Sequence, residues 1–316
     1  EILKKVAKED PSIKININEQ TGESLMSGMG ELHLEIIENR IRSEKGLDVK
    51  TSAPIIVYRE SIGKESKTFE GRSPNKHNSF FIKVAPLEEE IYQKIMSGEL
   101  PETRIKKKND EVTKVLSGMG WGSDEIRNIK DIYKGSVLSD ETRGEVHIGE
   151  VIEMVMDAFE MVMDQGPLAR EPCMKMKVSL VDIKLHEDAI HRGPAQVYPA
   201  VREGIHEAMK SAAPTLLEPL QVHLIEVPDN FVGAITKLIG GKRGQMLDMK
   251  QDGTNAEITS KLPVAEMIGW SSDLRSATEG RGVSSLKDQQ FEKVPAGMQA
   301  DVIRKIRERK GLAKNQ

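Results

Sequence analysis

The sequence is poor in the residues from which disulfide frameworks and thiolate metal sites are built. It contains one cysteine, Cys173, in 316 residues, so an internal disulfide and a zinc cage made of thiolates are both excluded. This cysteine usage is typical of a reducing compartment. No run of about 18 apolar residues occurs, and residues 1–5 show no signal-peptide pattern. We therefore expect a cytoplasmic protein without a membrane partner.

Nucleotide-binding motifs are missing as well. A phosphate-binding loop of the form Gly-x-x-x-x-Gly-Lys-Ser/Thr needs a glycine at its first position and a hydroxyl after its lysine. Around Gly241-Lys242 these two positions hold Thr236 and Arg243. Residues 75–78, Asn-Lys-His-Asn, lack the aspartate that would read guanine. The sequence therefore predicts that this chain itself binds no GTP, ATP or other cofactor.

Histidine spacing argues against a helical zinc site. His186 and His191 flank a glutamate, but they stand at i and i+5, where the zinc motif needs i and i+4. On a helix this spacing would separate the two imidazoles by about 140°. We expect no metal site, and we interpret His33, beside the glycine-rich turn 28–30, as a surface or packing residue.

The composition is that of a folded chain with local basic segments. Hydrophobic residues make up 38% and charged residues 30% of the chain, whose formal net charge is −4. The length predicts two or three domains. Residues 71–84 contain basic side chains and no carboxylate, and residues 302–316 contain six basic side chains against Glu308 alone. Such basic segments on a mildly acidic chain are compatible with docking to nucleic acid at defined points.

The order of the expected elements predicts an α+β protein of three folded parts. In residues 1–60 the order α-β-β-α-β is one strand short of the ferredoxin-like β-α-β-β-α-β unit, so we expect that residue 1 is not a natural start. The complete order recurs in residues 219–287. Between them, residues 61–218 are expected to form a different α/β domain, and residues 288–316 a basic C-terminal extension or helix.

Two polar loops of the middle domain are the candidate functional residues. One loop, 73–78, lies between two expected strands, and the other, 185–196, joins a strand to the start of a helix. Basic, amide and imidazole side chains on projecting loops suit contacts with phosphate, ribose and base edges of RNA, although ordinary solvated loops would look similar. The residues predicted to contact RNA are Ser73, Pro74, Asn75, Lys76, His77, Asn78, His186, Asp188, Arg192, Gly193 and Gln196.

These loops also carry a resemblance to a known family. Residues 188–193, Asp-Ala-Ile-His-Arg-Gly, resemble the segment whose histidine is converted to diphthamide in the elongation factor 2 family of ribosomal translocases. Residues 73–78 are similar to a tip loop of the fourth domain of that family, and residues 25–35 to the signature of its third. Arg243-Gly244 and residues 280–282 resemble landmarks of its fifth. The chain thus resembles the C-terminal part of this family, which has archaeal members and is related to bacterial elongation factor G.

The resemblance implies domains III, IV and V of a translocase whose GTPase and β-barrel domains are not included. Residues 61–218 would be its elongated domain IV, with a fold like that of ribosomal protein S5. GTP and Mg²⁺ would bind in that GTPase domain, so the parent would be a GTPase while this chain is not expected to be an enzyme. It implies a monomer whose domain IV tip enters the ribosomal A site, with rRNA, A-site tRNA and mRNA as partners. His191 would be the diphthamide site and the diphthamide-synthesis enzymes further partners. Two departures are Ser79, where the family often has a basic residue, and Pro194-Ala195, where eukaryotic relatives carry glycines.

Two other functions remain as alternatives. A free-standing enzyme built on ferredoxin-like units would use Glu187, Asp188 and His191 as acid–base groups. Another translocase-like ribosome factor, from the rescue or biogenesis branch, would lack the diphthamide segment, and residues 188–193 argue against it.

Overall fold

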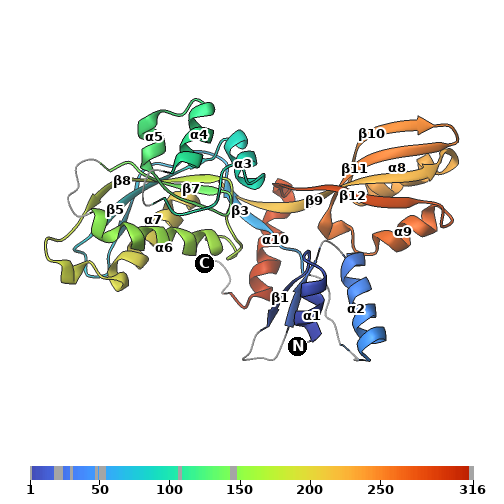
Figure 1. The fold of residues 1–316 in the computed structure, drawn as a ribbon, viewed down its shortest axis with the longest axis horizontal. Coiled ribbons are helices and arrows are strands. Elements are labelled where there is room, and N and C mark those ends of the chain that lie inside the picture. The colour runs from blue at the N-terminus through green and yellow to red at the C-terminus, as the bar shows by residue number, and fades with distance from the viewer. Residues whose placement is uncertain are drawn as a thin grey trace. The chain divides into compact units, whose positions relative to one another are not determined.

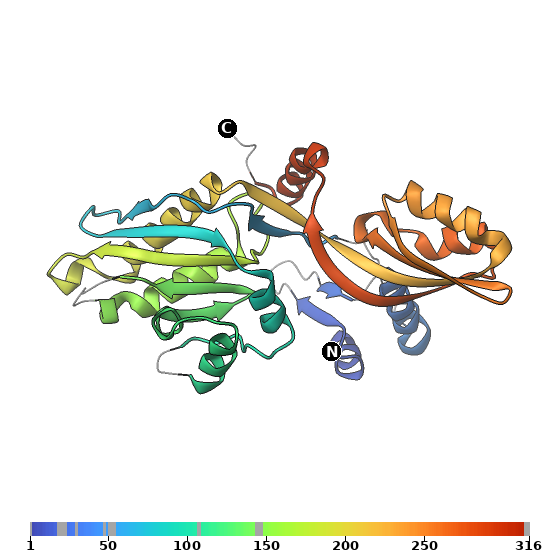
Figure 2. The ribbon, with the colours of Figure 1, turned by 90° about the horizontal axis from the view of Figure 1, so that it is seen from above.

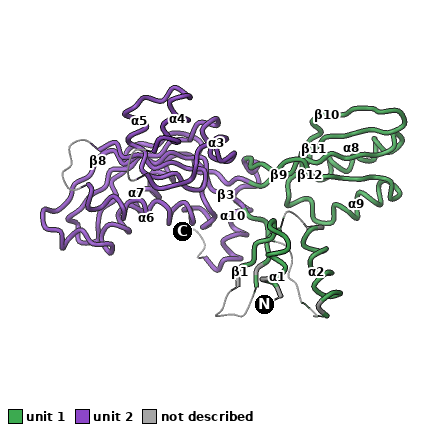
Figure 3. The backbone as a smooth tube through the Cα atoms, in the orientation of Figure 1, with its two compact units in different colours: residues 1–57, 218–292 green, residues 58–217, 293–316 purple. Residues whose placement is uncertain are grey.

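The computed structural model divides the chain into two compact units (Figure 3). Unit 1 comprises residues 1–57 and 218–292, and unit 2 comprises residues 58–217 and 293–316. The residues that the structure describes are 2–17, 24–28, 31–46, 49, 55–105, 109–142 and 148–312.

Unit 2 is built on a five-stranded mixed sheet with helices packed against it (Figures 1 and 2). Strands β7 and β8 are parallel, and the other neighbouring pairs are antiparallel. Helices α6 (Ile148–Asp164) and α7 (Pro194–Ser211) lie side by side and share one apolar core with the sheet. In sheet order, the strands are β4 (Phe69–Arg72), β5 (Ser79–Pro86), β8 (Met176–Lys184), β7 (Ser136–Asp140) and β6 (Ile129–Tyr133).

The core of unit 2 follows from the periodicity of its sequence. On α6, Val151, Val155 and Phe159 recur at four-residue spacing and are buried. On β5, Phe80 and Ile82 alternate with less buried neighbours and point to the same face. Each such side chain contributes about 1.5–3 kcal/mol by leaving water. The predicted helix and the alternating strands of the middle domain are therefore present.

Three short helices of unit 2 were not predicted: α3 (Glu89–Met96), α4 (Asp110–Gly118) and α5 (Ser123–Asn128). Helix α4 begins at Asn109, whose side chain accepts hydrogen bonds from the N–H groups of Glu111 and Val112. Each of the three has at most nine residues, too short for a strong helical period in the sequence.

The two ends of the middle segment and the C-terminal helix complete unit 2. Strand β3 (Arg59–Ile62) pairs antiparallel with residues 214–217 of β9 (Pro214–Pro228). Helix α10 (Ala296–Arg309) is held to the 168–170 loop, where Arg307 donates to the Leu168 carbonyl and Lys310 donates to the Arg170 carbonyl. The residues predicted to form a basic C-terminal extension or helix thus include a helix of this unit.

The 218–292 part of unit 1 has the predicted ferredoxin-like order. Its sheet runs β10-β11-β9-β12, and the helices α8 and α9 alternate with the strands along the chain. The α+β class and the complete β-α-β-β-α-β order are therefore confirmed. After β9, the elements are η2 (Asp229–Phe231), α8 (Val232–Gly241), β10 (Gln245–Asp252), β11 (Asn255–Pro263), η3 (Val264–Glu266), α9 (Trp270–Ala277) and β12 (Val283–Lys293).

The glycine and arginine landmarks of this part are structural. Arg243 donates two hydrogen bonds to the Glu218 carboxylate and one to Glu266. These two acids raise its pKa, and its guanidinium stays charged. A Cβ at Gly244 would lie 2.6 Å from Leu262 and 2.7 Å from Ile239, so glycine is needed where helix meets strand. This agrees with a packing role rather than a nucleotide site.

The N-terminal part of unit 1 contains α1 (Ile2–Glu9), the antiparallel pair β1 (Lys14–Ile17) and β2 (Ser24–Ser27), and α2 (Glu31–Lys45). Its small core includes Val6, Ile13, Ile37 and Ile41. Residues 29–30 of the third-domain signature lie outside the described residues, and so does most of the 47–51 segment, where the last strand of the expected α-β-β-α-β order would fall. His33 is half-buried with Nε2 2.9 Å from an Asp10 oxygen, in line with a packing role.

Candidate nucleic-acid interface

Strand register brings the two predicted loops together at one end of unit 2. In the antiparallel pair of β5 and β8, Ser79 stands opposite Lys184. The loop 73–78 ends where β5 begins, and the loop 185–193 begins where β8 ends. The two segments, more than a hundred residues apart in sequence, therefore leave the sheet side by side. We call them the first and second tip loops.

The first tip loop is closed by its own side chains. The Ser73 hydroxyl donates to the Asn75 side-chain oxygen (2.6 Å) and accepts from the Asn78 N–H (2.9 Å). At its turn, Lys76 has a φ of 61°, in the left-handed region that is unfavourable for a side chain with a Cβ. Lys76, Pro74 and His77 are exposed, so this turn presents a cation and an imidazole to solvent.

Amide side chains of the first loop hold the second. The Asn78 Oδ1 accepts from the His186 N–H (3.1 Å), and its Nδ2 donates to the His191 carbonyl (2.8 Å). Asn75 Nδ2 donates to the same carbonyl at 3.2 Å, and the Asn75 N–H donates to Gln196 Oε1 at 2.9 Å. Three hydrogen bonds thus join the two loops, and a fourth joins the first loop to Gln196 at the start of α7, so the predicted residues form one assembly.

Three histidine rings meet at this assembly. The ring centroids of His186 and His191 are 4.5 Å apart, and those of His77 lie 4.8 Å and 5.0 Å from them. The second loop is not a regular helix here, so the helical argument that separated His186 from His191 does not apply. Even so, within the described ranges no three His, Cys, Asp or Glu side chains are placed to hold a metal ion.

The second tip loop is held locally by its acid and ends in a helix cap. Asp188 Oδ1 accepts from the Ile190 N–H (3.0 Å), which starts the short 3-10 helix η1 (Ala189–His191). Ile190 is 78% exposed, which is unusual for a large apolar side chain. Gly193 and Pro194 then start α7, where a proline costs no hydrogen bond.

Three predicted contact residues are buried instead. The exposed fractions are 2% for Ser73, 0% for Asn78 and 5% for Arg192. Arg192 Nη2 lies 2.7 Å from a Glu150 oxygen, so its charge is used within the protein. This differs from the predicted contact role, because these side chains fasten the loops and offer almost no surface to RNA in this conformation.

Sequence reasoning missed two features of the site. It gave no role to Ile190, because an isolated apolar residue in a loop carries no pattern. It also treated Asn78 as a contact residue, because a polar side chain in a loop gives no sign of burial. The spacing between the loops contained no signal that could have predicted their hydrogen bonds.

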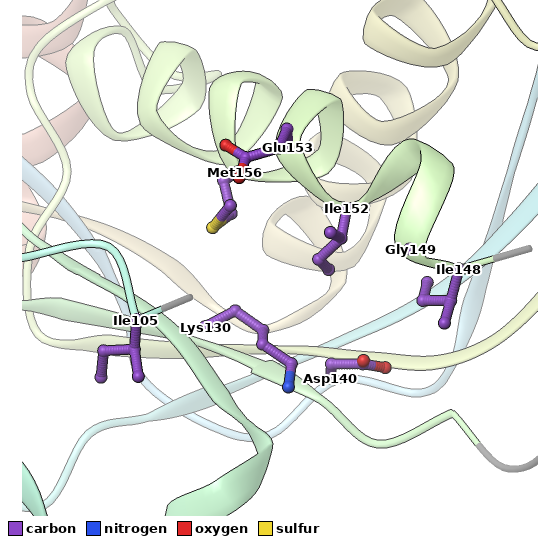
Figure 4. A pocket seen from close by; sticks show the side chains of 8 residues that line it. All are labelled: Ile105, Lys130, Asp140, Ile148, Gly149, Ile152, Glu153 and Met156. Carbon is purple, nitrogen blue, oxygen red and sulfur yellow. The ribbon is translucent and has the colours of Figure 1, made fainter. Parts of the chain in front are cut away.

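A hollow elsewhere in unit 2 has different chemistry. It has a volume of about 210 Å³ and is lined by apolar side chains, with Lys130, Asp140 and Glu153 among them (Figure 4). In Figure 4 the Lys130 side chain extends toward Asp140. None of the acid–base groups predicted for a free-standing enzyme lines it.

Comparisons with known proteins match the chain over most of its length. Family models match residues 1–53 (Elongation Factor G, domain III), 99–213 (Elongation factor G, domain IV) and 215–302 (Elongation factor G C-terminus). The chain belongs to the elongation factor G and elongation factor 2 family. The matched models are those of domains III and IV and the C-terminus, as the resemblance implied.

Curated members of the family from archaea are similar over the whole chain. The elongation factor 2 of Nanoarchaeum equitans is 50% identical over 316 residues, which cover 99% of this chain and 42% of that protein. Those of Methanosphaera stadtmanae and Pyrococcus horikoshii are each 47% identical and are covered to 42% and 43%. The chain therefore spans less than half the length of these relatives. Within the described ranges, no helix combines the length and the apolar character needed to cross a membrane.

Proposed function

We propose that the whole protein containing this chain is a GTP-dependent ribosomal translocase, in which the two tip loops of unit 2 enter the A site. The family membership and the interlocked, partly basic tip loops support this proposal. GTP and Mg²⁺ would bind in a part of the protein outside this chain, and this chain would make and break no bond. The protein would work as a monomer in the cytoplasm.

The exposed residues of the tip would make the RNA contacts. Lys76 at the turn of the first loop would neutralise a phosphate, and the rings of His77 and His191 would contact ribose or base edges of the paired mRNA and tRNA. By occupying the space that the moving tRNA has left, the tip would prevent its return. The buried residues Ser73, Asn78 and Arg192 would support these contacts without making them.

His191 is the proposed diphthamide site. Its carbonyl is fixed by the first loop while its ring stands among the other two histidines at the tip. A bulky, charged addition to this ring would lengthen its reach toward RNA. The mass of the His191-bearing peptide from natively produced protein tests this assignment: an increase localised to His191 supports it, and an unmodified peptide refutes it.

A lysine substitution tests the RNA contact itself. Lys76→Asn keeps a residue that tolerates a positive φ while removing the charge. In the whole protein, log affinity for ribosomes falls linearly with log salt concentration, and the magnitude of this slope should decrease by about 1. The affinity itself should be lower than that of the wild type. The matched control is Lys114→Gln, an exposed lysine on α4, which should leave the slope unchanged. An unchanged slope for Lys76→Asn would remove this contact from the proposal.

The free-standing enzyme is not favoured by the site. The Asp188 carboxylate caps η1, and the hollow of unit 2 contains neither this acid nor His191. Turnover of nucleotides or esters by the isolated chain, abolished by His191→Ala, would revive that alternative.

A further inference from the structure

Asn78 is connected to both ends of the 186–191 segment. Its side-chain oxygen accepts from the His186 N–H, and its side-chain nitrogen donates to the His191 carbonyl. The same nitrogen lies 3.3 Å from the Ser73 hydroxyl, and the residue is fully buried. One amide therefore closes a six-residue segment into a loop of fixed span.

The other hydrogen bonds of this segment are mostly local, such as the one that Asp188 accepts from the Ile190 N–H. Glu187, Asp188, Ala189 and Ile190 are all exposed, and the one large apolar side chain among them is 78% exposed. Burial of apolar surface, which holds the neighbouring helix α7, is therefore absent between residues 187 and 190. Segments with few buried contacts open at low free-energy cost unless hydrogen bonds tie them to a stable element. The β4–β5 hairpin, through Asn78 and Asn75, is that element.

The chemistry at position 78 requires an amide. The backbone N–H of His186 needs an acceptor, and the backbone carbonyl of His191 needs a donor. An asparagine supplies both from one planar group. An aspartate of the same shape keeps the acceptor but sets a negative oxygen against the His191 carbonyl. Alanine leaves both backbone groups without this partner.

We propose that Asn78 is a positioning residue that sets the place of His191 and its ring at the tip. This inference rests on the proposed function, because the tip is taken as the part that contacts RNA. Asn78 touches no RNA itself. It acts by holding the His191 backbone and, through His186, the neighbouring ring. Asn75, with its longer bond to the same carbonyl, adds to this effect.

Hydrogen exchange on the whole chain tests the positioning directly. In Asn78→Asp, exchange of the amides in residues 186–192 should rise about 10- to 100-fold, because the His191 carbonyl loses the shorter of its two hydrogen bonds and faces a negative oxygen instead. The ring proton shifts of His77, His186 and His191 should move together, since each ring lies in the field of the other two. Peptides from α6 and α7 should exchange as before. The matched control is Asn109→Asp, which makes the same change at a helix cap where aspartate is equally suitable.

Unchanged exchange in residues 186–192 together with unchanged ring shifts would overturn the proposal. If Asn78→Asp unfolds unit 2, faster exchange of the α6 peptides will reveal it. Asn75→Asp then carries the test, because it keeps the side-chain oxygen that accepts from Ser73 and His77 and removes the 3.2 Å donation to the His191 carbonyl. It should produce a smaller rise in the same peptides, and no rise would count against positioning.

A frameshift reporter with the whole protein separates this inference from the proposed function. Faster loop exchange with more frameshifting supports both. Faster loop exchange with an unchanged frameshift rate supports the positioning role and contradicts the contact of the tip with paired mRNA and tRNA. More frameshifting from a loop that exchanges at the normal rate contradicts the positioning role alone.

Discussion

A single glycine sets the distance between the strand that leads into the first tip loop and the helix that follows the second. Gly71 on β4 is buried against α7. A Cβ at Gly71 would lie 2.0 Å from the Ala200 carbonyl oxygen and 2.9 Å from the Gly204 nitrogen. Real Cβ atoms essentially never come closer than 3.0 Å to such atoms, so β4 and α7 would have to separate by about 1 Å. Gly71→Ala should therefore destabilise unit 2.

The expected loss in the free energy of unfolding lies at the upper end of the losses that overpacked cores cause. Backbone atoms of α7 form the obstacle, and no side-chain rotation can relieve the contact. We expect a loss of about 3 kcal/mol in the free energy of unfolding of unit 2. The population of the open state should then rise about 150-fold. Because the displaced elements carry both tip loops, frame maintenance should suffer as well.

Hydrogen exchange with mass spectrometry measures this loss within one sample. Peptides from α6 and β8 report unit 2, and peptides from α8 and β11 of unit 1 serve as an internal control that should not change. Gly149→Ala on α6 is the matched variant, because nothing lies within 4 Å of its added Cβ. If Gly71→Ala lowers the free energy of unfolding of unit 2 by less than about 1 kcal/mol, the packing argument is refuted.

Three further predictions concern groups away from the tip. Burial and then the neighbouring Glu160 carboxylate raise the pKa of Asp131 from 3.8 to about 7, so the folded state holds a proton that the unfolded state has lost between these pH values. The free energy of unfolding of unit 2 should thus fall as pH rises from about 4 to 7, and Asp131→Asn should flatten this fall in urea titrations. Arg243→Lys keeps the charge but loses the two-pronged pair with Glu218, and exchange of unit 1 peptides should show a loss of about 1–2 kcal/mol. Burial raises the pKa of the Cys173 thiol, so it should not react with a thiol reagent until the protein is denatured, and fast reaction would contradict this.

Periodic patterns made the cores and the general topology predictable. The α6 stripe and the alternating residues of β8 are visible in the sequence because burial on one face leaves a period of 3.6 or 2. Strand β9 was predicted only at 222–227 and extends over Pro214–Pro228. Pro219, which has no N–H to donate, lies between the residues that pair with β3 and those that pair with β11. Strand β12 runs seven residues past its predicted end because much of it is exposed and no apolar pattern continues.

The site was predictable in its residue types but not in its roles. Basic and amide residues in two loops led to the prediction of RNA contact, and residues 188–193 resemble the diphthamide segment of the family. Nothing in the sequence places Asn78 beneath the second loop, because that contact depends on the register of Ser79 with Lys184. The pairing of Arg192 with Glu150 likewise depends on tertiary packing across more than forty residues.

Directed cleavage of rRNA tests the placement of the tip most directly. Cys173 is buried, so an introduced cysteine would be the reactive one. Ile190→Cys places a tethered iron chelate at the exposed apex of the second loop. Met96→Cys places the chelate on α3, which follows the end of β5 that is remote from the tip loops; β5 itself is about 25 Å long. With the whole protein on ribosomes, the probe at 190 should cut rRNA around the decoding A site, and the probe at 96 should give a different pattern. No cleavage near the A site from position 190, with cleavage from position 96 retained, would contradict the central claim.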